Sequence, residues 1–334
     1  GADWRPSKRG YPKIGSLHIN QNFNSNFMYR IINIIKNGAN IIFMDIKNIF
    51  KPNKLFINVF FARKNGKLIT NHNWGDDINI SFLQEISNLN IIVKNISFLF
   101  KFIPIKNYNC IGSIIGPYTD KHTIIWGSGI IKPDMPIPNG PLKVCSVRGP
   151  LTRQILLKHN IECPEKYGDP ALLVSQYYKP KIQKKYEIGI IPHYSDEANE
   201  VLNNFCKEHP ETTIIHMTGY KNWHEIPNKI LSCKRIISSS LHGLIIADSY
   251  GIPNSWVKFS DKIGVNDNFK YWDYFASVGR ECKEPIVIKT IKNIQDIIDN
   301  NIFEVAKNID FRIIFETCPF KDNLKDYLII RSDK

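Results

Sequence analysis

The second half of the sequence alternates short apolar segments with amphipathic ones, and this alternation restricts the fold more than any other feature. The apolar segments predict strands at 187–191, 212–217, 235–238, 254–259 and 285–289. The segments between them predict helices at 195–207, 223–233, 243–250 and 269–278. Short apolar strands separated by helices are typical of a parallel sheet covered on both faces. We therefore predict a Rossmann-like α/β domain in this half.

The first half shows the same alternation less regularly. Strands are expected at 55–61, 110–115, 123–126 and 144–147, and helices at 76–89 and 150–159. A helix at 27–36 that feeds a strand at 40–44 is a further expectation, and 291–327 reads as helix. The predicted organisation is an N-terminal extension at 1–50, Rossmann-like domains at 51–180 and 186–290, and a helical tail at 291–334. The charged tract at 181–185 is expected to mark the boundary between the two domains.

The charge and cysteine content restrict the partners of the chain. Lys and Arg number 44 against 31 Asp and Glu, a net charge of +13. Such an excess favours nucleic acid, anionic lipid or an anionic substrate. Because no arginine-rich block or zinc-finger spacing is present, we expect lipid or substrate and no nucleic acid. The seven cysteines contain no C-x-x-C pair, which argues for free thiols in a reducing, cytoplasmic compartment and against a metal site.

One turn of the second half combines the features of an anion site. Ser238-Ser239-Ser240-Leu241-His242-Gly243 follows an apolar strand and opens an apolar helix. A helix start offers unpaired N–H groups and a positive dipole end, and His242 adds a group able to move a proton near neutral pH. The turn is therefore a candidate site for a phosphate or carboxylate with acid–base chemistry beside it.

Three turns of the first half have the same strand–turn–helix character. They are Asn73-Trp74-Gly75-Asp76-Asp77, Trp126-Gly127-Ser128-Gly129 and Ser146-Val147-Arg148-Gly149-Pro150. In doubly wound sheets such turns gather at the carboxyl ends of the strands, where ligands bind. Each also has a purely structural interpretation: acidic residues cap helices, glycines permit tight turns, and an arginine pairs with a carboxylate.

Together with further segments, these turns resemble the polysaccharide pyruvyl transferase family. The additional matching pieces, in the same order along the chain, are Ile111-Gly112-Ser113-Ile114, Tyr167-Gly168-Asp169-Pro170-Ala171-Leu172-Leu173 and Tyr271-Trp272-Asp273-Tyr274-Phe275-Ala276-Ser277-Val278-Gly279-Arg280. The pieces cover roughly residues 55–285, and residues 1–50 lie outside them.

The resemblance implies two Rossmann-like domains in a glycosyltransferase-B-like arrangement with the active site in a cleft between them. It implies phosphoenolpyruvate as donor substrate, no cofactor, and a sugar acceptor in a bacterial polysaccharide or its polyprenyl-diphosphate-linked repeat unit. The product would be a cyclic pyruvate ketal, commonly bridging O4 and O6 of a hexose, with release of phosphate. The family histidine corresponds to His242 and the family arginine to Arg148. A second arginine of some members is replaced by Ser240.

The resemblance and the residue types together give the predicted site. His242, Asp76 and Asp77 are the candidate catalytic residues, since a histidine can protonate the leaving phosphate and a carboxylate can deprotonate a hydroxyl. Asn73 and Trp74 are the candidate acceptor-binding residues. The candidate donor-binding residues are Arg148, Ser239, Ser240, Leu241, Gly243, Gly127, Ser128, Gly129 and Arg280, with Arg153 and Lys258 as other sources of the cation missing at Ser240.

Two alternatives stay open from the sequence. A nucleotide-sugar glycosyltransferase would have the same fold class, and a non-catalytic relative would bind a sugar or an anion without turnover. Because lipid-linked acceptors lie at a membrane, the basic surface also predicts peripheral contact with anionic lipid at the inner face of the cytoplasmic membrane.

Overall fold

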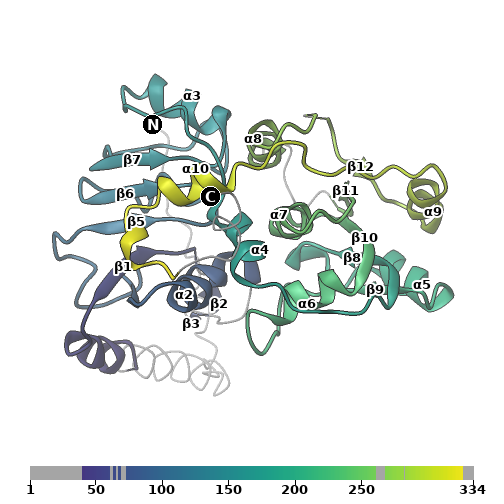
Figure 1. Cartoon of the computed structure of the whole chain (residues 1–334), viewed down its shortest axis with the longest axis horizontal. Coiled ribbons are helices and arrows are strands. Elements are labelled where there is room, and N and C mark those ends of the chain that lie inside the picture. Colours follow the sequence, from purple (N-terminus) through teal and green to yellow (C-terminus); the bar gives the residue numbers. More distant parts are fainter. Residues whose placement is uncertain are drawn as a thin grey trace, which may run out of the picture.

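The computed structural model describes residues 40–60, 63–64, 67–68, 73–260, 268–281 and 283–325. Within these residues the chain forms two five-stranded sheets, seen on the left and right of Figure 1, in which every pair of neighbouring strands is parallel. The predicted α/β class with two parallel sheets is confirmed. The finer prediction of a glycosyltransferase-B-like arrangement with a cleft, and the predicted domain limits, stay predictions.

The first sheet has the strand order β4-β1-β5-β6-β7. Its strands are β1 (Lys54–Asn58), β4 (Asn90–Val93), β5 (Asn107–Asn109), β6 (Thr123–Trp126) and β7 (Lys143–Ser146), and a two-stranded ribbon of β2 (Arg63–Lys64) and β3 (Lys67–Leu68) follows β1. Helices α2 (Trp74–Ile86) and α3 (Pro150–Lys158) belong to this half. All four residues of β6 are buried, as expected for a strand covered on both faces.

The second sheet has the order β12-β11-β10-β8-β9. Its strands are β8 (Tyr186–Ile191), β9 (Thr212–Ile214), β10 (Cys233–Ser238), β11 (Asn254–Lys258) and β12 (Ile286–Val287). The helices of this half are η2 (Tyr194–Asp196), α5 (Glu200–Glu208), α6 (Glu225–Leu231), α7 (Leu241–Ser249), α8 (Phe269–Ser277) and α9 (Ile291–Asp299). Helix α7 is buried at every residue, so it packs among other elements along its whole length.

Within the described residues, the chain passes between the two halves twice. The short helices η1 (Pro170–Leu173) and α4 (Val174–Tyr177) lead from the first sheet to the second. The segment with α10 (Phe311–Glu316) and η4 (Lys321–Asn323) then returns to the first sheet, as the yellow ribbon of Figure 1 shows. The Trp126 indole donates to the Ile314 carbonyl at 2.9 Å, and Thr317 bonds to the Ser146 hydroxyl at 3.1 Å.

Several sequence predictions for individual elements are wrong. Residues 110–115 form turns instead of a strand, because Gly112 and Gly116 have φ values of +99° and +125° that extended strands do not use. Residues 40–49 are helical where a strand was expected at 40–44. The predicted single helix at 291–327 is broken between α9 and α10. Strand β4 was not predicted, and the helix expected at 27–36 lies outside the described residues.

Candidate functional site

The serine-rich turn is held in place by its own hydroxyls. Ser238 Oγ accepts from the Ser240 N–H at 3.0 Å and donates to the Ser240 carbonyl at 2.9 Å. Ser239 Oγ accepts from the His193 N–H at 2.8 Å. A Cβ at Gly243 would overlap Ser238 Oγ, so glycine is needed for α7 to pack on β10. The hydroxyls of Ser238 and Ser239 are thus used within the protein, whereas Ser240, the N-cap residue, makes no side-chain capping bond.

His242 lies in the first turn of α7 and faces the start of α2 from the other half. A Cβ added to Gly75 would overlap the imidazole ring, so the two helix starts touch at this point. His242 Nε2 is buried and has no hydrogen-bond partner among the residues that the structure describes. Burial, helped by the positive charges of Arg148 and Lys270, lowers the pKa of His242 to about 3. The imidazole is therefore neutral at physiological pH.

The first turn of α2, which touches the His242 ring at Gly75, carries two carboxylates, Asp76 and Asp77. Asn73 caps the helix, since its Oδ1 accepts from the Gly75 N–H at 3.4 Å, and its amide donates to Asp76 Oδ2 at 2.6 Å. Burial and the neighbouring charge of Asp77 raise the pKa of Asp76 to about 7, against the opposing effects of Asn73 and Lys270. Asp76 therefore changes its protonation state near neutral pH, as a general acid or base must.

Asp77 and Trp74 contact the second half directly. The Tyr220 hydroxyl donates to Asp77 Oδ2 at 2.5 Å. The Trp74 backbone N–H donates to the Met217 carbonyl, and its indole donates to the Trp223 carbonyl, both at 2.8 Å. Because the Trp74 ring is fully buried, stacking on a sugar, as predicted from the sequence, would require the two halves to move apart.

Arg148 is completely buried at the boundary between the halves. Its guanidinium donates to Asp273 of α8 at 3.0 Å, to the Ser113 hydroxyl at 2.6 Å and to the Ile130 carbonyl at 2.9 Å. Asp273 also accepts from the N–H and the hydroxyl of Thr152. In this arrangement Arg148 joins α8 to the first sheet and supplies positive charge close to His242. Direct contact with a donor substrate stays a prediction.

The Gly127-Ser128-Gly129 turn fits closely around these residues. A Cβ at Gly129 would overlap the Arg148 guanidinium, and a Cβ at Gly127, whose φ is +72°, would overlap Pro170. Ser128 donates to the Gly112 carbonyl at 2.8 Å. The two glycines thus allow Arg148 and Pro170 of the same chain to approach the turn closely. The predicted contact of this turn with a ligand stays a prediction.

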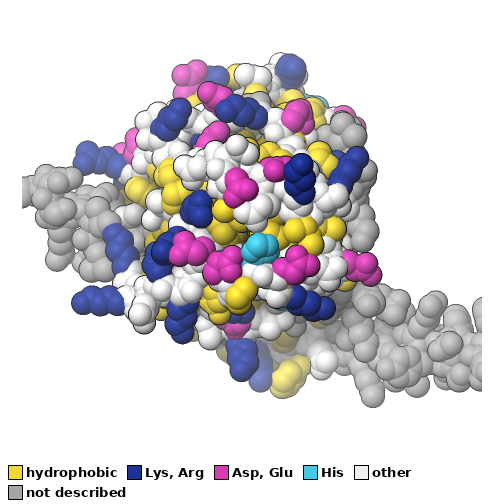
Figure 2. Space-filling model, turned by 90° about the vertical axis from the view of Figure 1, so that its right-hand side faces the viewer, with side chains coloured by type: hydrophobic (Ala, Val, Ile, Leu, Met, Phe, Trp, Pro, Cys, Tyr) yellow, Lys and Arg dark blue, Asp and Glu magenta, His cyan; other side chains and the backbone are white. Residues whose placement is uncertain are grey.

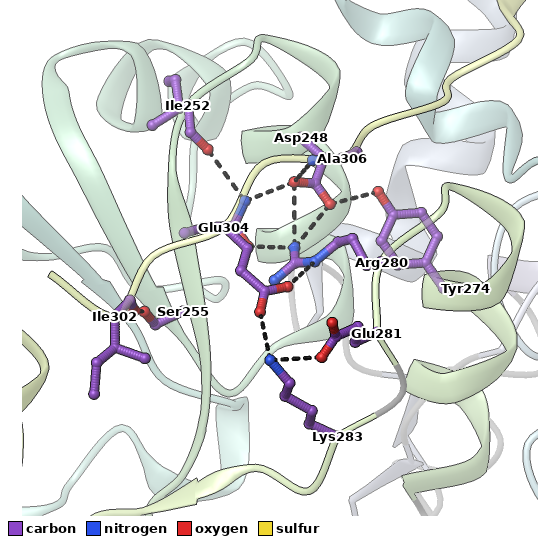
Figure 3. Close-up of polar contacts among 11 residues, drawn as sticks. Asp248, Ile252, Ser255, Tyr274, Arg280, Glu281, Lys283, Ile302, Glu304 and Ala306 are labelled. Atoms are coloured by element: carbon purple, nitrogen blue, oxygen red, sulfur yellow. Dashed lines mark hydrogen bonds and ion pairs between the residues drawn. The ribbon is translucent and has the colours of Figure 1, made fainter.

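Arg280 lies apart from the other predicted residues. Figure 3 shows its guanidinium between Asp248, at 3.0 Å, and Glu304, at 3.7 Å, and it also donates to Asn254 at 2.6 Å. Asp248 lies six residues after His242 on α7, about 9 Å along the helix at 1.5 Å per residue. The described contacts therefore tie Arg280 to the far end of α7.

Two groups that act electrostatically on Asp76, Asp169 and Lys270, were not singled out as site residues from the sequence. Asp169 caps η1 through Oδ1, which accepts from the Ala171 N–H at 2.9 Å, while Oδ2 is buried without a hydrogen-bond partner in the described part of the chain. Burial raises the pKa of Asp169 to about 6. Lys270, on α8, acts electrostatically on both His242 and Asp76. The Gly-Asp-Pro turn could be recognised in the sequence. Nothing in the sequence around Lys270 indicated that its charge acts on His242 and Asp76.

The described residues contain no group of three or more His, Cys, Asp or Glu side chains placed to hold a metal ion. A groove of about 1060 Å³ lies elsewhere, lined among others by Lys106, Lys143, Lys166 and Glu316. It does not include the residues around His242. No helix within the described ranges has both the length and the apolar character needed to cross a membrane.

Comparison with known proteins identifies the family. The polysaccharide pyruvyl transferase family matches residues 60–260, which is more than half of the chain, and the protein belongs to this family. The chain is 33% identical over 184 residues to uncharacterized protein L143 of Acanthamoeba polyphaga mimivirus, which covers 52% of this chain and 62% of that protein. It is 26% identical over 163 residues to succinoglycan biosynthesis protein ExoV of Rhizobium meliloti, covering 47% of this chain and 48% of ExoV.

The chain thus spans about half to three fifths of the length of these curated relatives. No solved structure matches it. The resemblance found in the motifs is confirmed at the level of the family.

Proposed function

We propose that this protein transfers pyruvate from phosphoenolpyruvate to two hydroxyls of a sugar in a polysaccharide or its lipid-linked repeat unit. The product is a cyclic ketal bridging O4 and O6, and phosphate is released. Membership of the family supports pyruvyl transfer, and one relative is named for the biosynthesis of a polysaccharide. The observation that carries the proposal for the site is the buried, unpartnered Nε2 of His242 at the point where α7 touches the start of α2, the helix that carries Asp76.

The charges around His242 suit a substrate that carries both phosphate and carboxylate. Arg148 and Lys270 place positive charge near a neutral imidazole at a helix start, and such starts favour anions. Burial and these two cations hold the pKa of His242 low. A bound phosphate supplies opposing negative charge, which raises the pKa of a neighbouring histidine. Donor binding thereby turns His242 into an acid able to protonate the departing phosphate.

Asp76 is the proposed base. Ketal formation begins when a sugar hydroxyl attacks C2 of the enol phosphate while C3 takes up a proton and becomes a methyl group. A second hydroxyl then attacks C2 and the C2–O bond to phosphate breaks. The two hydroxyl protons account for the new C–H bond and the proton on phosphate. A pKa of about 7 lets Asp76 accept a hydroxyl proton and release it again. The neighbouring Asp77 holds the start of α2 against the second half of the chain through its hydrogen bond from Tyr220.

The test is phosphate release from phosphoenolpyruvate with a panel of hexosides that carry free O4 and O6 hydroxyls. We expect His242→Ala and Asp76→Asn to lower the rate by 10²–10⁴, the range of general acid–base catalysis. His159→Ala, at an exposed histidine after α3, is the matched control and should leave the rate unchanged.

Donor binding is measured separately by thermal shift. Phosphoenolpyruvate should stabilise the wild-type protein, and Arg148→Lys, which keeps the charge but loses the forked geometry, should reduce that stabilisation. Stabilisation by nucleoside diphosphates with none by phosphoenolpyruvate would refute the proposal and favour a nucleotide-sugar glycosyltransferase. Stabilisation by phosphoenolpyruvate without phosphate release on any hexoside would favour a non-catalytic binding protein.

A further inference from the structure

Large apolar side chains are exposed together at one corner of the molecule. Helical residues 40–49, the dark purple coil at the lower left of Figure 1, stand out below the first sheet. This helix and the loop at 97–103 carry most of the exposed large apolar side chains of the described residues. We name the following set the phenylalanine patch: Phe43, Met44, Ile46, Ile49, Phe50, Phe98, Phe102 and Ile103.

The helix and the loop form one surface because a buried carboxylate joins them. Asp45 Oδ2 accepts from the Phe98 N–H at 2.7 Å and from the Leu99 N–H at 2.9 Å. Asp45 is only 3% exposed, although the residues on both sides of it in the helix are exposed. The one inward-facing polar group therefore fixes the helix against the loop, and the apolar side chains are left on the outside.

The exposed area is large for a protein surface. Phe43, Phe50, Phe98 and Phe102 are 57%, 81%, 62% and 82% exposed. At about 200 Å² for each phenylalanine, these four residues expose roughly 560 Å², before the other four side chains of the patch are counted. The largest apolar patch of a typical monomer is about 300–600 Å² in total and is often functional. This corner thus exceeds what an ordinary solvent-facing surface carries.

The exposed charges of the two segments that form the patch are of one sign. Lys47, Lys51, Lys101 and Lys106 are exposed within the same two segments, 40–51 and 96–106, whose one acidic residue is the buried Asp45. Two of these lysines lie over patch rings, Lys47 over Phe43 at 4.5 Å and Lys101 over Phe102 at 5.6 Å. On the opposite end of the molecule, shown in Figure 2, basic and acidic side chains are instead interspersed.

We propose that the phenylalanine patch docks this protein on an anionic lipid bilayer. Apolar side chains ringed by lysines are the arrangement that inserts into the boundary between headgroups and acyl chains while the ammonium groups meet lipid phosphates. The absence of exposed acidic groups from both segments favours an anionic surface over a neutral one. This surface is separate from the site around His242, so docking and pyruvyl transfer can fail independently.

Vesicle co-sedimentation tests the proposal with the full chain. We expect binding to vesicles of 30% phosphatidylglycerol in phosphatidylcholine, weaker binding in 0.5 M salt, and little binding to phosphatidylcholine alone. Phe50→Ser combined with Phe102→Ser should weaken binding at least tenfold, because each ring loses the free energy of its insertion. Leu157→Ser, at an exposed apolar residue of α3, is the matched control and should bind like the wild type.

Two results would overturn the proposal. One is wild-type protein that stays in the supernatant at low salt, or that binds equally well after both phenylalanines are replaced. The other is a dimer of the wild-type protein, measured by light scattering, that becomes monomeric in the double variant without any lipid binding. That outcome would assign the patch to a second copy of the chain. Phosphate release on a soluble hexoside should be the same in the double variant as in the wild type.

Discussion

The ion pair between Arg148 and Asp273 gives the sharpest prediction about how the two halves are held together. Both side chains are fully buried, and the N–O distance is 3.0 Å. Asp273 further accepts from the N–H and hydroxyl of Thr152 at 2.8 and 2.6 Å. Asp273→Ala removes all of these acceptors and leaves the arginine charge buried without its counter-ion. We expect this substitution to be strongly destabilising.

The magnitude follows from the burial of the pair. Removing one partner of a buried ion pair lowers the free energy of unfolding by about 3–5 kcal/mol, because an uncompensated charge remains buried. Replacing both partners by apolar groups costs much less, since no charge is left behind. Adding Arg148→Met to Asp273→Ala should therefore restore at least about 2 kcal/mol. The two substitutions are in direct contact, so their effects are not expected to add.

Urea unfolding followed by tryptophan fluorescence measures each variant. The matched control is Asp134→Ala, which breaks the pair with Lys132 at 3.5 Å, in which both side chains are exposed. Such a surface pair contributes less than about 1 kcal/mol. The reasoning would be refuted if Asp273→Ala cost less than 1 kcal/mol, or if the double variant lost the sum of the two single losses within 0.5 kcal/mol.

The remaining predictions concern the contact between α2 and α7 and the perturbed pKa values. Gly75→Ala should displace His242, abolish phosphate release and lower the free energy of unfolding by about 1–3 kcal/mol through overpacking. Gly140→Ala is the control and should change neither activity nor stability, because its added Cβ has its nearest neighbour at 4.0 Å. Equal activity of the two variants would contradict the contact between Gly75 and His242. The pKa of Asp76 is raised from 3.8 to about 7, so the folded protein binds the Asp76 proton more tightly than the unfolded chain does. This proton binding stabilises the fold fully below pH 3.8, and the stabilisation is lost as the pH rises through about 7. Asp76→Asn should thus gain stability relative to wild type between pH 4 and pH 8, by at most about 4 kcal/mol, and a constant difference across that range would argue against the shift. In a histidine NMR titration of the empty protein, His242 should not titrate between pH 5 and 8, and a midpoint in that range would show that its imidazole is not held neutral by burial.

Most of the fold could be predicted from local sequence patterns. Strand β8 and helices α3, α7 and α8 lie within one or two residues of the predicted segments, because their apolar runs end at clear turn residues. The errors occur where the local pattern was ambiguous. Residues 110–115 are apolar enough for a strand, but Gly112 within the segment and Gly116 directly after it adopt positive φ values. Residues 41–44 are all apolar, and such a short run does not distinguish a strand from a helix.

The candidate site was predicted in part. Its motifs could be found because strand–turn–helix transitions have a characteristic sequence, and their order along the chain indicated the family that residues 60–260 confirm. The partners of each side chain could not be found this way. Arg148 meets Asp273 across 125 positions in the sequence, and Tyr220 meets Asp77 across 143. Such pairs leave no local pattern.

The sequence by itself determined the α/β class, the helix starts and the residue types available for chemistry, because these depend on periodicity and on turn residues close together in the chain. Only the tertiary structure decided that the starts of α2 and α7 touch, that Trp74 and Arg148 are buried, and that Arg280 belongs to the far end of α7. It also decided the protonation of His242 and Asp76, since burial and charges from distant segments set their pKa values. Solvent exclusion is a property of the packed molecule, and no single segment of the sequence contains it.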